Sequence, residues 1–182
     1  MSRLILLNGP PACGKSTLAQ HWVNEHPMTL NLDIDIVRAL IGRWQDAPTR
    51  SGTLARAIAM AAARAHLESG NDVIAPQHLG RPQFIEQLER LAADVGAEFR
   101  EVMLLDSREN TFIRFAERTS AARASEHTDA HHLLESMGGQ SELDAMYNRS
   151  LAIIASRPQT LVVRSEAGKL DETYQLLGQA LK

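Results

Sequence analysis

A glycine-rich segment near the N-terminus carries the residues best suited to chemistry. It reads Gly9-Pro-Pro-Ala-Cys-Gly-Lys-Ser16 and fits the phosphate-loop pattern GxxxxGK[ST]. Glycines allow a tight turn whose backbone N–H groups point inward at an anion, and the positive end of the following helix adds to that attraction. Lys15 would reach the β- and γ-phosphates of ATP, and the Ser16 hydroxyl would coordinate Mg²⁺. The residues expected to bind ATP are Gly9, Pro10, Pro11, Ala12, Cys13, Gly14, Lys15, Ser16 and Thr17.

Two carboxylates follow the second apolar run of the chain. If residues 30–34 form a strand, Asp33 and Asp35 lie at i and i+2 on the same face. The carboxyl ends of strands border the ligand crevice of a parallel sheet. One carboxylate could hold Mg²⁺ through water, and the other could accept the proton of an attacking hydroxyl. The alternative is that Asp35 only caps the helix that begins after it.

Arginines recur on the helical pattern after the fourth apolar run. Arg114 and Arg118 lie at i and i+4 on one face, and Arg123 follows them. Like charges at this spacing destabilise a helix by about 0.2–0.5 kcal/mol unless something neutralises them. A bound triphosphate would do so, and arginines stabilise charge in phosphoryl transfer. The alternative is that Arg114 pairs with Glu117 at i+3.

Several polar residues follow the second and third apolar runs and would lie on the crevice side of the sheet. Each of them, taken alone, is also compatible with a solvated loop position. The weaker candidates for contact with a second substrate are Arg38, Arg43, Gln77, His78 and Arg81.

Short apolar runs that alternate with helical patterns must position these residues. Strands are expected at 4–7, 30–34, 72–75, 99–105 and 160–163. Helices are expected at 15–25, 36–44, 53–69, 83–95, 107–124, 141–156 and 171–181, with Ser107 as an N-cap. The alternation predicts an α/β fold with a parallel sheet covered on both faces. The 182 residues suit one domain.

Composition excludes several classes of protein. The net charge of −3, the pI of about 6.2 and the aromatic content of 4% argue against a general nucleic-acid binder. No apolar stretch approaches the ~18 residues of a membrane span. The single Cys13 excludes an internal disulfide and suits a reducing cytosol, so we expect a cytoplasmic protein. The sequence does not indicate an oligomeric state.

Three segments resemble the small P-loop kinases, the group of adenylate, shikimate and gluconate kinases. The segments are LILLNGPPACGKST, LNLDIDIVR and FIRFAERT, and the chain is most similar to the chloramphenicol phosphotransferase and tunicamycin-resistance type. The resemblance implies a three-layer α/β/α sandwich with a five-stranded parallel sheet of order 2-3-1-4-5. It also implies a mobile lid at about residues 119–140 and an adenine border at 164–168. In this likeness Asp33 lies near Mg²⁺, Asp35 near the substrate hydroxyl, and Arg118 against ATP.

These observations lead us to expect an ATP-dependent phosphotransferase that acts on a hydroxyl of a small molecule, such as an antibiotic, a nucleoside or a sugar-like compound. Lys15, Asp35 and Arg118 are the expected catalytic residues. A GTPase would need an NKxD motif, which the sequence lacks. A large ring-type ATPase would need a longer chain and an apolar run that ends in Asp-Glu, whereas the third expected strand ends without an acid. A non-catalytic ATP sensor and a polynucleotide 5′-kinase are the alternatives, although the acidic pI disfavours the second.

Overall fold

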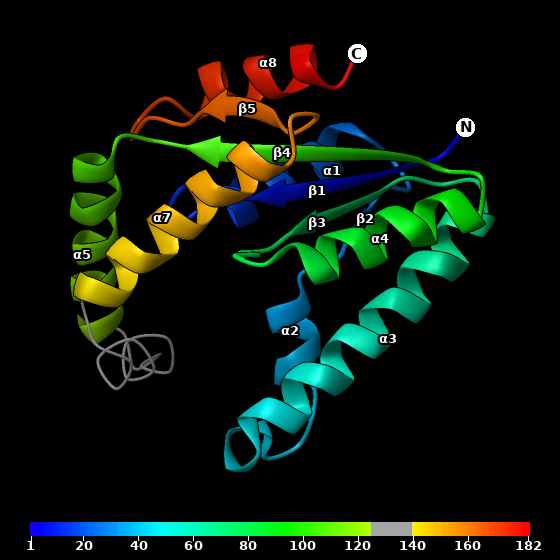
Figure 1. Ribbon diagram of the computed structural model, residues 1–182, viewed down its shortest axis with the longest axis horizontal. Helices are drawn as coiled ribbons and strands as arrows, with labels where there is room; N and C mark the ends of the chain where they lie inside the picture. Colours follow the sequence, from blue (N-terminus) through cyan, green and yellow to red (C-terminus); the bar gives the residue numbers. More distant parts are fainter. Residues whose placement is uncertain (125–139) are drawn as a thin grey trace.

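The computed structural model describes the backbone of residues 1–124 and 140–182, and their side chains except those of 118–124. Five strands form one parallel sheet of order β2-β3-β1-β4-β5, which confirms the expected fold and strand order (Figure 1). The strands are β1 (Arg3–Asn8), β2 (Leu30–Asn31), β3 (Val73–Pro76), β4 (Glu98–Leu105) and β5 (Leu161–Arg164). The helices are α1 (Lys15–Glu25), α2 (Ile34–Ala39), α3 (Pro48–Glu68), α4 (Pro82–Asp94), α5 (Arg108–Ala124), α7 (Gln140–Ser156) and α8 (Leu170–Ala180), with a 3₁₀ turn η1 (Trp44–Asp46).

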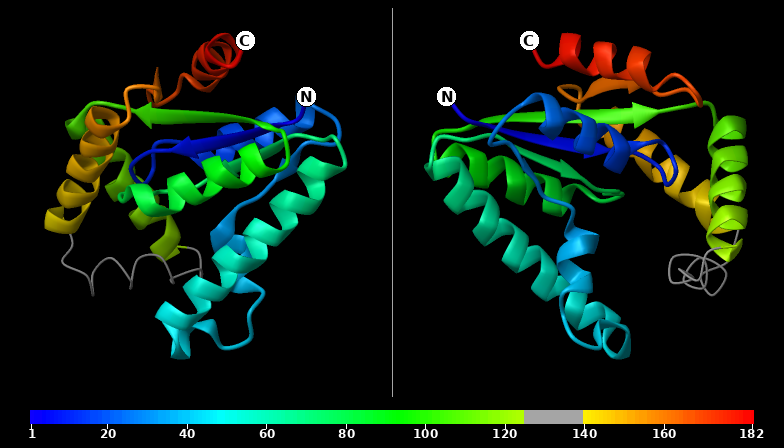
Figure 2. Two further views of the ribbon diagram at one scale, coloured as in Figure 1. Left: turned by 45° about the vertical axis from the view of Figure 1, so that its right-hand side comes forward. Right: turned by 180° about the vertical axis from the view of Figure 1, so that it is seen from behind.

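The central strand β1 is buried on both faces, so its alternate side chains belong to two separate cores. Leu4 and Leu6 pack in the core under α3 and α4, whereas Ile5 and Leu7 pack in the core under α1 and α8. The views from opposite sides show α3 and α4 on one face of the sheet and α1 and α8 on the other (Figures 1 and 2). This three-layer arrangement brings the carboxyl ends of all five strands to one edge.

The second strand is shorter than its sequence indicates. Only Leu30 and Asn31 pair with β3, and the chain then turns into α2. Asp33 is the N-cap of that helix, and its Oδ1 accepts a hydrogen bond from the backbone N–H of Asp35 at 2.9 Å. The prediction that Asp33 and Asp35 share one face of a strand is therefore wrong. The physical reason is that an aspartate side chain satisfies an unpaired N–H of a first helical turn better than it extends a strand.

Two further boundaries bear on the site. Helix α3 begins at Pro48 rather than at Thr53, because a proline is well suited to the first position of a helix. Helix α5 has the expected N-cap, since the backbone N–H of Asn110 donates to Ser107 Oγ at 3.1 Å.

Most of the lid expected at about 119–140 lies outside the described residues. Over the described ranges, no helix combines the length and the apolar character that a membrane span needs.

Candidate active site

The phosphate loop leaves the end of β1 and enters α1, as the motif requires. Gly9, Ala12 and Gly14 have positive φ angles of 151°, 62° and 90°. A Cβ on Gly9 would overlap the carbonyl oxygen of Leu104 on β4 and come within 2.8 Å of Cys13 Sγ. The loop therefore needs glycine at its first position for space as well as for conformation.

The Lys15 side chain folds inside the curve of this loop. Its Nζ donates hydrogen bonds to the carbonyl oxygens of Gly9 at 2.9 Å and Pro10 at 2.7 Å, and it lies 3.6 Å from Cys13 Sγ. Cys13 itself is buried, so its side chain packs beneath the loop while the loop backbone faces the cavity. This places the ammonium where the phosphates of a nucleotide would lie.

A buried amide that the sequence did not indicate anchors the loop. Asn8, the last residue of β1, is fully buried and accepts hydrogen bonds at Oδ1 from the backbone N–H groups of Gly9 at 2.8 Å and Leu79 at 2.9 Å. Its Nδ2 donates to the Leu79 carbonyl at 3.0 Å. Asn8 therefore ties the phosphate loop to the segment between β3 and α4 through three hydrogen bonds.

The carboxylates reach the site from the start of α2. Ser16 Oγ donates to Asp33 Oδ2 at 3.3 Å, which brings the two expected Mg²⁺ ligands together. Among the described residues no three His, Cys, Asp or Glu side chains gather as in an all-protein metal site. A hydroxyl and a carboxylate beside a phosphate site fit Mg²⁺, because this ion keeps several waters and takes substrate phosphates as ligands.

Asp35 has an unusual electrostatic environment. Desolvation by the cavity walls raises the pKa of its carboxyl above the ordinary value, and the negative charge of Asp33 raises it further. Arg38, Lys15 and a hydrogen bond with Gln77 act in the opposite direction on this pKa. A carboxylate with a raised pKa accepts protons more readily than an ordinary aspartate.

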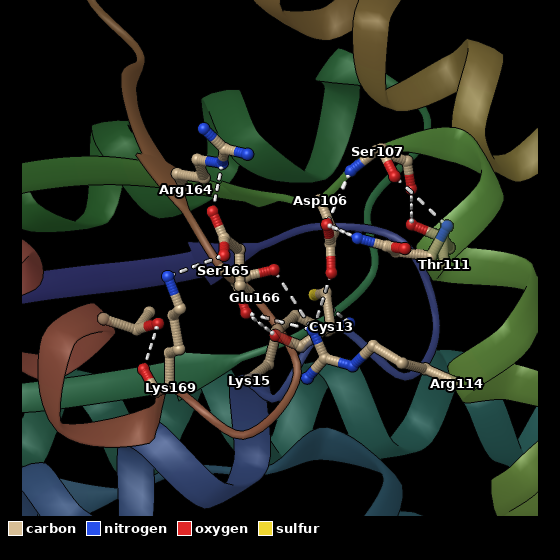
Figure 3. Close-up of polar contacts among 12 residues, drawn as sticks. Cys13, Lys15, Asp106, Ser107, Thr111, Arg114, Arg164, Ser165, Glu166 and Lys169 are labelled. Atoms are coloured by element: carbon tan, nitrogen blue, oxygen red, sulfur yellow. Dashed lines mark hydrogen bonds and ion pairs between the residues drawn. The ribbon is translucent and has the colours of Figure 1, made fainter.

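Arg114 of α5 is fixed against the phosphate loop by a network that sequence reasoning missed (Figure 3). Its Nη1 donates to Asp106 Oδ2 at 3.2 Å and to the Ser165 carbonyl at 3.1 Å. Asp106 is almost fully buried, and Ser165 Oγ donates in turn to the Cys13 carbonyl at 2.7 Å. Arg114 therefore pairs with Asp106, not with Glu117, and the ends of β4 and β5 hold its guanidinium beside the loop.

A cavity of about 830 Å³ gathers many of the candidates at the carboxyl edge of the sheet. It is bordered by Ala167 and Gly168, which belong to the loop expected to border the adenine. The candidates that line it are Pro11, Ala12, Gly14, Lys15, Ser16, Thr17, Asp33, Asp35, Gln77 and Arg114.

Other candidates do not line that cavity. Arg38 lies over the Trp44 ring at 4.2 Å, and Arg43 is largely exposed and pairs with Asp46 at 2.6 Å. Neither arginine lines the two cavities described at the carboxyl edge, although the charge of Arg38 acts on Asp35, so contact of either arginine with a second substrate stays a prediction. Arg43 has a φ of 52°, a left-handed conformation at the start of η1. The side chains of Arg118 and Arg123 lie outside the described residues.

A second cavity of about 880 Å³ adjoins the first and is lined by residues of α3, α4 and α7. His78 and Met146 line both cavities, and Arg81 lines only the second. His78 Nδ1 lies 3.1 Å from the Gly9 carbonyl oxygen, which can only accept, so Nδ1 carries the hydrogen and Nε2 is an acceptor. The pKa of His78 is lowered to about 4, mainly because the ring is buried and next because Lys15 is positively charged. The ring is therefore neutral at pH 7.

Comparison with known proteins bears on the fold and the family of the chain. No curated protein sequence matches the chain significantly. The gluconokinase from Sinorhizobium meliloti 1021 has a TM-score of 0.62 and 16% identity over 97% of this chain and 90% of its own. The APS kinase from Mycobacterium tuberculosis, solved with AMPPNP and APS, has a TM-score of 0.60 and 17% identity, with coverage of 99% and 97%. The tunicamycin resistance protein of Deinococcus radiodurans has a TM-score of 0.59 and 16% identity, with coverage of 98% and 95%.

At these identities the solved structures establish the fold of the chain and not its reaction. A family model adds evidence from the sequence. The family AAA_33, described as an AAA domain, matches residues 4–142, which include the phosphate loop, both carboxylates and Arg114. The chain therefore belongs to this AAA domain family and has the five-stranded fold of the small P-loop kinases.

Proposed function

We propose that the protein is an ATP-dependent kinase that phosphorylates a hydroxyl group of a small molecule. The observation that carries this proposal is the pair of adjoining cavities. The first cavity is lined by the phosphate loop and by the Asp33 and Asp35 carboxylates. The second cavity lies beside it, and His78 lines both. A nucleotide in the first cavity would present its γ-phosphate to an acceptor in the second. The names of the gluconokinase and the APS kinase with this fold support the same class of reaction here.

In the proposed reaction, the oxygen of the acceptor hydroxyl attacks the γ-phosphorus of ATP. The bond from the γ-phosphorus to the bridging oxygen breaks, and ADP leaves with the electron pair. The hydroxyl proton passes to the Asp35 carboxylate, whose raised pKa suits it to this role. Lys15 and Arg114 offset negative charge on the phosphates during transfer.

The residues present fit a divalent cation. Ser16 Oγ and Asp33 Oδ2 would hold Mg²⁺, which neutralises charge on the β- and γ-phosphates when it is bound. Asp33 also caps α2 through the backbone N–H of Asp35, so the same carboxylate fixes the position of Asp35 in the first turn of that helix.

The test is turnover of ATP with a panel of nucleosides, sugars, sugar acids and antibiotics, read as ADP release and as a mass gain of one phosphate on the acceptor. Asp35→Asn keeps the shape of the side chain and should lower kcat by about 10²–10⁴-fold, with little change in ATP affinity. Lys15→Ala should abolish turnover and leave the fold intact. Asp46→Asn is the matched control, because Asp46 is an exposed aspartate that pairs with Arg43 and lines neither of the two cavities described.

Two results would contradict the proposal. Full ATP turnover by Lys15→Ala would show that the phosphate loop is not the catalytic site. Tight ATP binding without phosphate transfer to any acceptor, together with unchanged behaviour of Asp35→Asn, would favour the non-catalytic sensor.

A further inference from the structure

The second cavity has a charge pattern that bears on the identity of the acceptor, so this inference rests on the proposed function. Part of its wall is apolar and comes from Ala57, Met60 and Leu79. Three arginines line the same cavity, one on α3, one directly before α4 and one on α7. These arginines are Arg56, Arg81 and Arg149.

Only one of the three arginines has a partner of opposite charge. Arg149 Nη2 pairs with Glu142 Oε1 at 2.5 Å, and among the residues that the structure describes Glu142 is the only acid that lines the cavity. Across residues 1–117 and 140–182, Arg56 and Arg81 form no ion pair. The Arg56 guanidinium lies 5.7 Å from the centre of the Phe84 ring, which forms part of the same wall.

The imbalance is notable because the whole chain is acidic. The chain has a net charge of −3, yet the described residues that line this cavity include three arginines and one glutamate. Two guanidinium groups without anionic partners beside an apolar wall are suited to a small organic anion, because arginine binds carboxylates and phosphates in a bidentate way.

The position of the second cavity fits an acceptor that has a hydroxyl at one end and a charged group at the other. His78 lines both cavities and presents Nε2 as an acceptor, so it can accept a hydrogen bond from a hydroxyl of the acceptor molecule where the cavities adjoin. Gly80 also lines the second cavity and packs closely against Arg149, since a Cβ on this residue would come within 2.9 Å of Arg149 Cδ. The hydroxyl would then face the phosphate loop while the remaining part of the molecule lies among the arginines.

We propose that the acceptor is a small hydroxylated anion, a hydroxy carboxylate or a phosphate or sulfate ester, whose charged group binds Arg56 and Arg81. A neutral sugar, nucleoside or antibiotic would leave both guanidinium groups without a partner in the cavity. Discrimination against such neutral compounds would follow from the lost charge-assisted hydrogen bonds.

The experiment compares hydroxy compounds that differ only in the anionic group. The pairs are a sugar and its sugar acid, a nucleoside and its 5′-monophosphate, and glycerol beside glycerate and glycerol phosphate. The readouts are phosphate transfer from ATP, the KM of each acceptor, and the Kd of a fluorescent ATP analogue. Carboxylate and phosphate members are scored separately, so the result also distinguishes these two sources of charge.

Arg56→Gln and Arg81→Gln are the test variants. Each should raise the KM of the anionic acceptor by about ten- to a hundredfold, with kcat and the Kd of the ATP analogue nearly unchanged. Arg50→Gln on α3 and Arg90→Gln on α4 are matched controls, because they remove the same charge from the same helices outside both cavities. The controls should keep the KM of the unmodified protein.

The possible outcomes separate this inference from the proposed function. Transfer to anionic members alone, weakened in the two test variants, supports both. Transfer to neutral members with no effect of Arg56→Gln or Arg81→Gln overturns the anionic acceptor and leaves the kinase intact. Binding of the ATP analogue without transfer to any anionic member also overturns the inference. Failure to bind the ATP analogue at all overturns the proposed function itself.

Discussion

His78 gives the protein a dependence of stability on pH whose size follows from its surroundings. Its pKa is lowered from 6.5 to about 4, first because burial penalises the imidazolium and next because the Lys15 ammonium repels it. Arg149 adds to the repulsion, whereas the Gly9 carbonyl and the Glu142 carboxylate favour the charged ring. The position between the two cavities therefore keeps the ring neutral over the physiological range.

The sign of the effect follows from proton binding in the two states. Between pH 6.5 and about 4 the unfolded chain binds a proton at His78 that the native protein does not, so the free energy of unfolding decreases as the pH falls through this window. At about 1.4 kcal/mol per pKa unit, the shift corresponds to roughly 3 kcal/mol. Above pH 6.5 the ring is largely neutral in both states, and its contribution to the pH dependence fades.

The assay is urea unfolding followed by circular dichroism from about pH 7.5 to about 4.5, a range that brackets histidine titration. His78→Asn and His78→Gln do not titrate, and both keep an N–H donor for the Gly9 carbonyl. On acidification both variants should lose up to about 3 kcal/mol less than the unmodified protein. Carboxylates titrate in all three proteins and cancel in the comparison. Equal losses in all three would refute the lowered pKa and the burial that explains it.

Three further predictions concern backbone space and buried charge. Gly9→Ala should abolish binding of a fluorescent ATP analogue, because the added Cβ would overlap a β4 carbonyl oxygen. Asp106→Asn should weaken that binding and lower the midpoint of thermal unfolding, since removal of one partner of a buried pair with Arg114 costs about 3–5 kcal/mol; unchanged values would mean that the pair is dispensable. Gly80→Ala should cost about 1–3 kcal/mol of stability through overpacking against Arg149. It should raise the KM of the acceptor more than the Kd of the ATP analogue, and an equal rise in both would count against separate cavities.

Features that depend on local pattern could be predicted from the sequence. The phosphate loop is one, because its glycines, its lysine and its strand and helix are contiguous between residues 3 and 25. The alternation of strands and helices also gave the α/β class, and the resemblance to the small P-loop kinases supplied the strand order. Element boundaries were less predictable. The carboxylate pair shows why, since Asp33 and Asp35 lie at a helix start and not on a strand. A capping hydrogen bond decided between two conformations that the residue types allow equally.

The tertiary structure alone decided which distant residues meet at the loop. Ser165 lies far from Cys13 in the chain, and it reaches the Cys13 carbonyl because β5 ends at the same edge of the sheet as β1. Asp106 follows β4 at that edge and holds Arg114 beside the loop. The same edge places His78 between the two cavities and brings Arg56 and Arg81 to one of them. The local sequence pattern does not indicate these contacts, because they depend on strand order and on how the helices lie across the sheet. The sequence by itself determined the phosphate-loop motif between a strand and a helix, and the packing of the three layers decided what surrounds that loop.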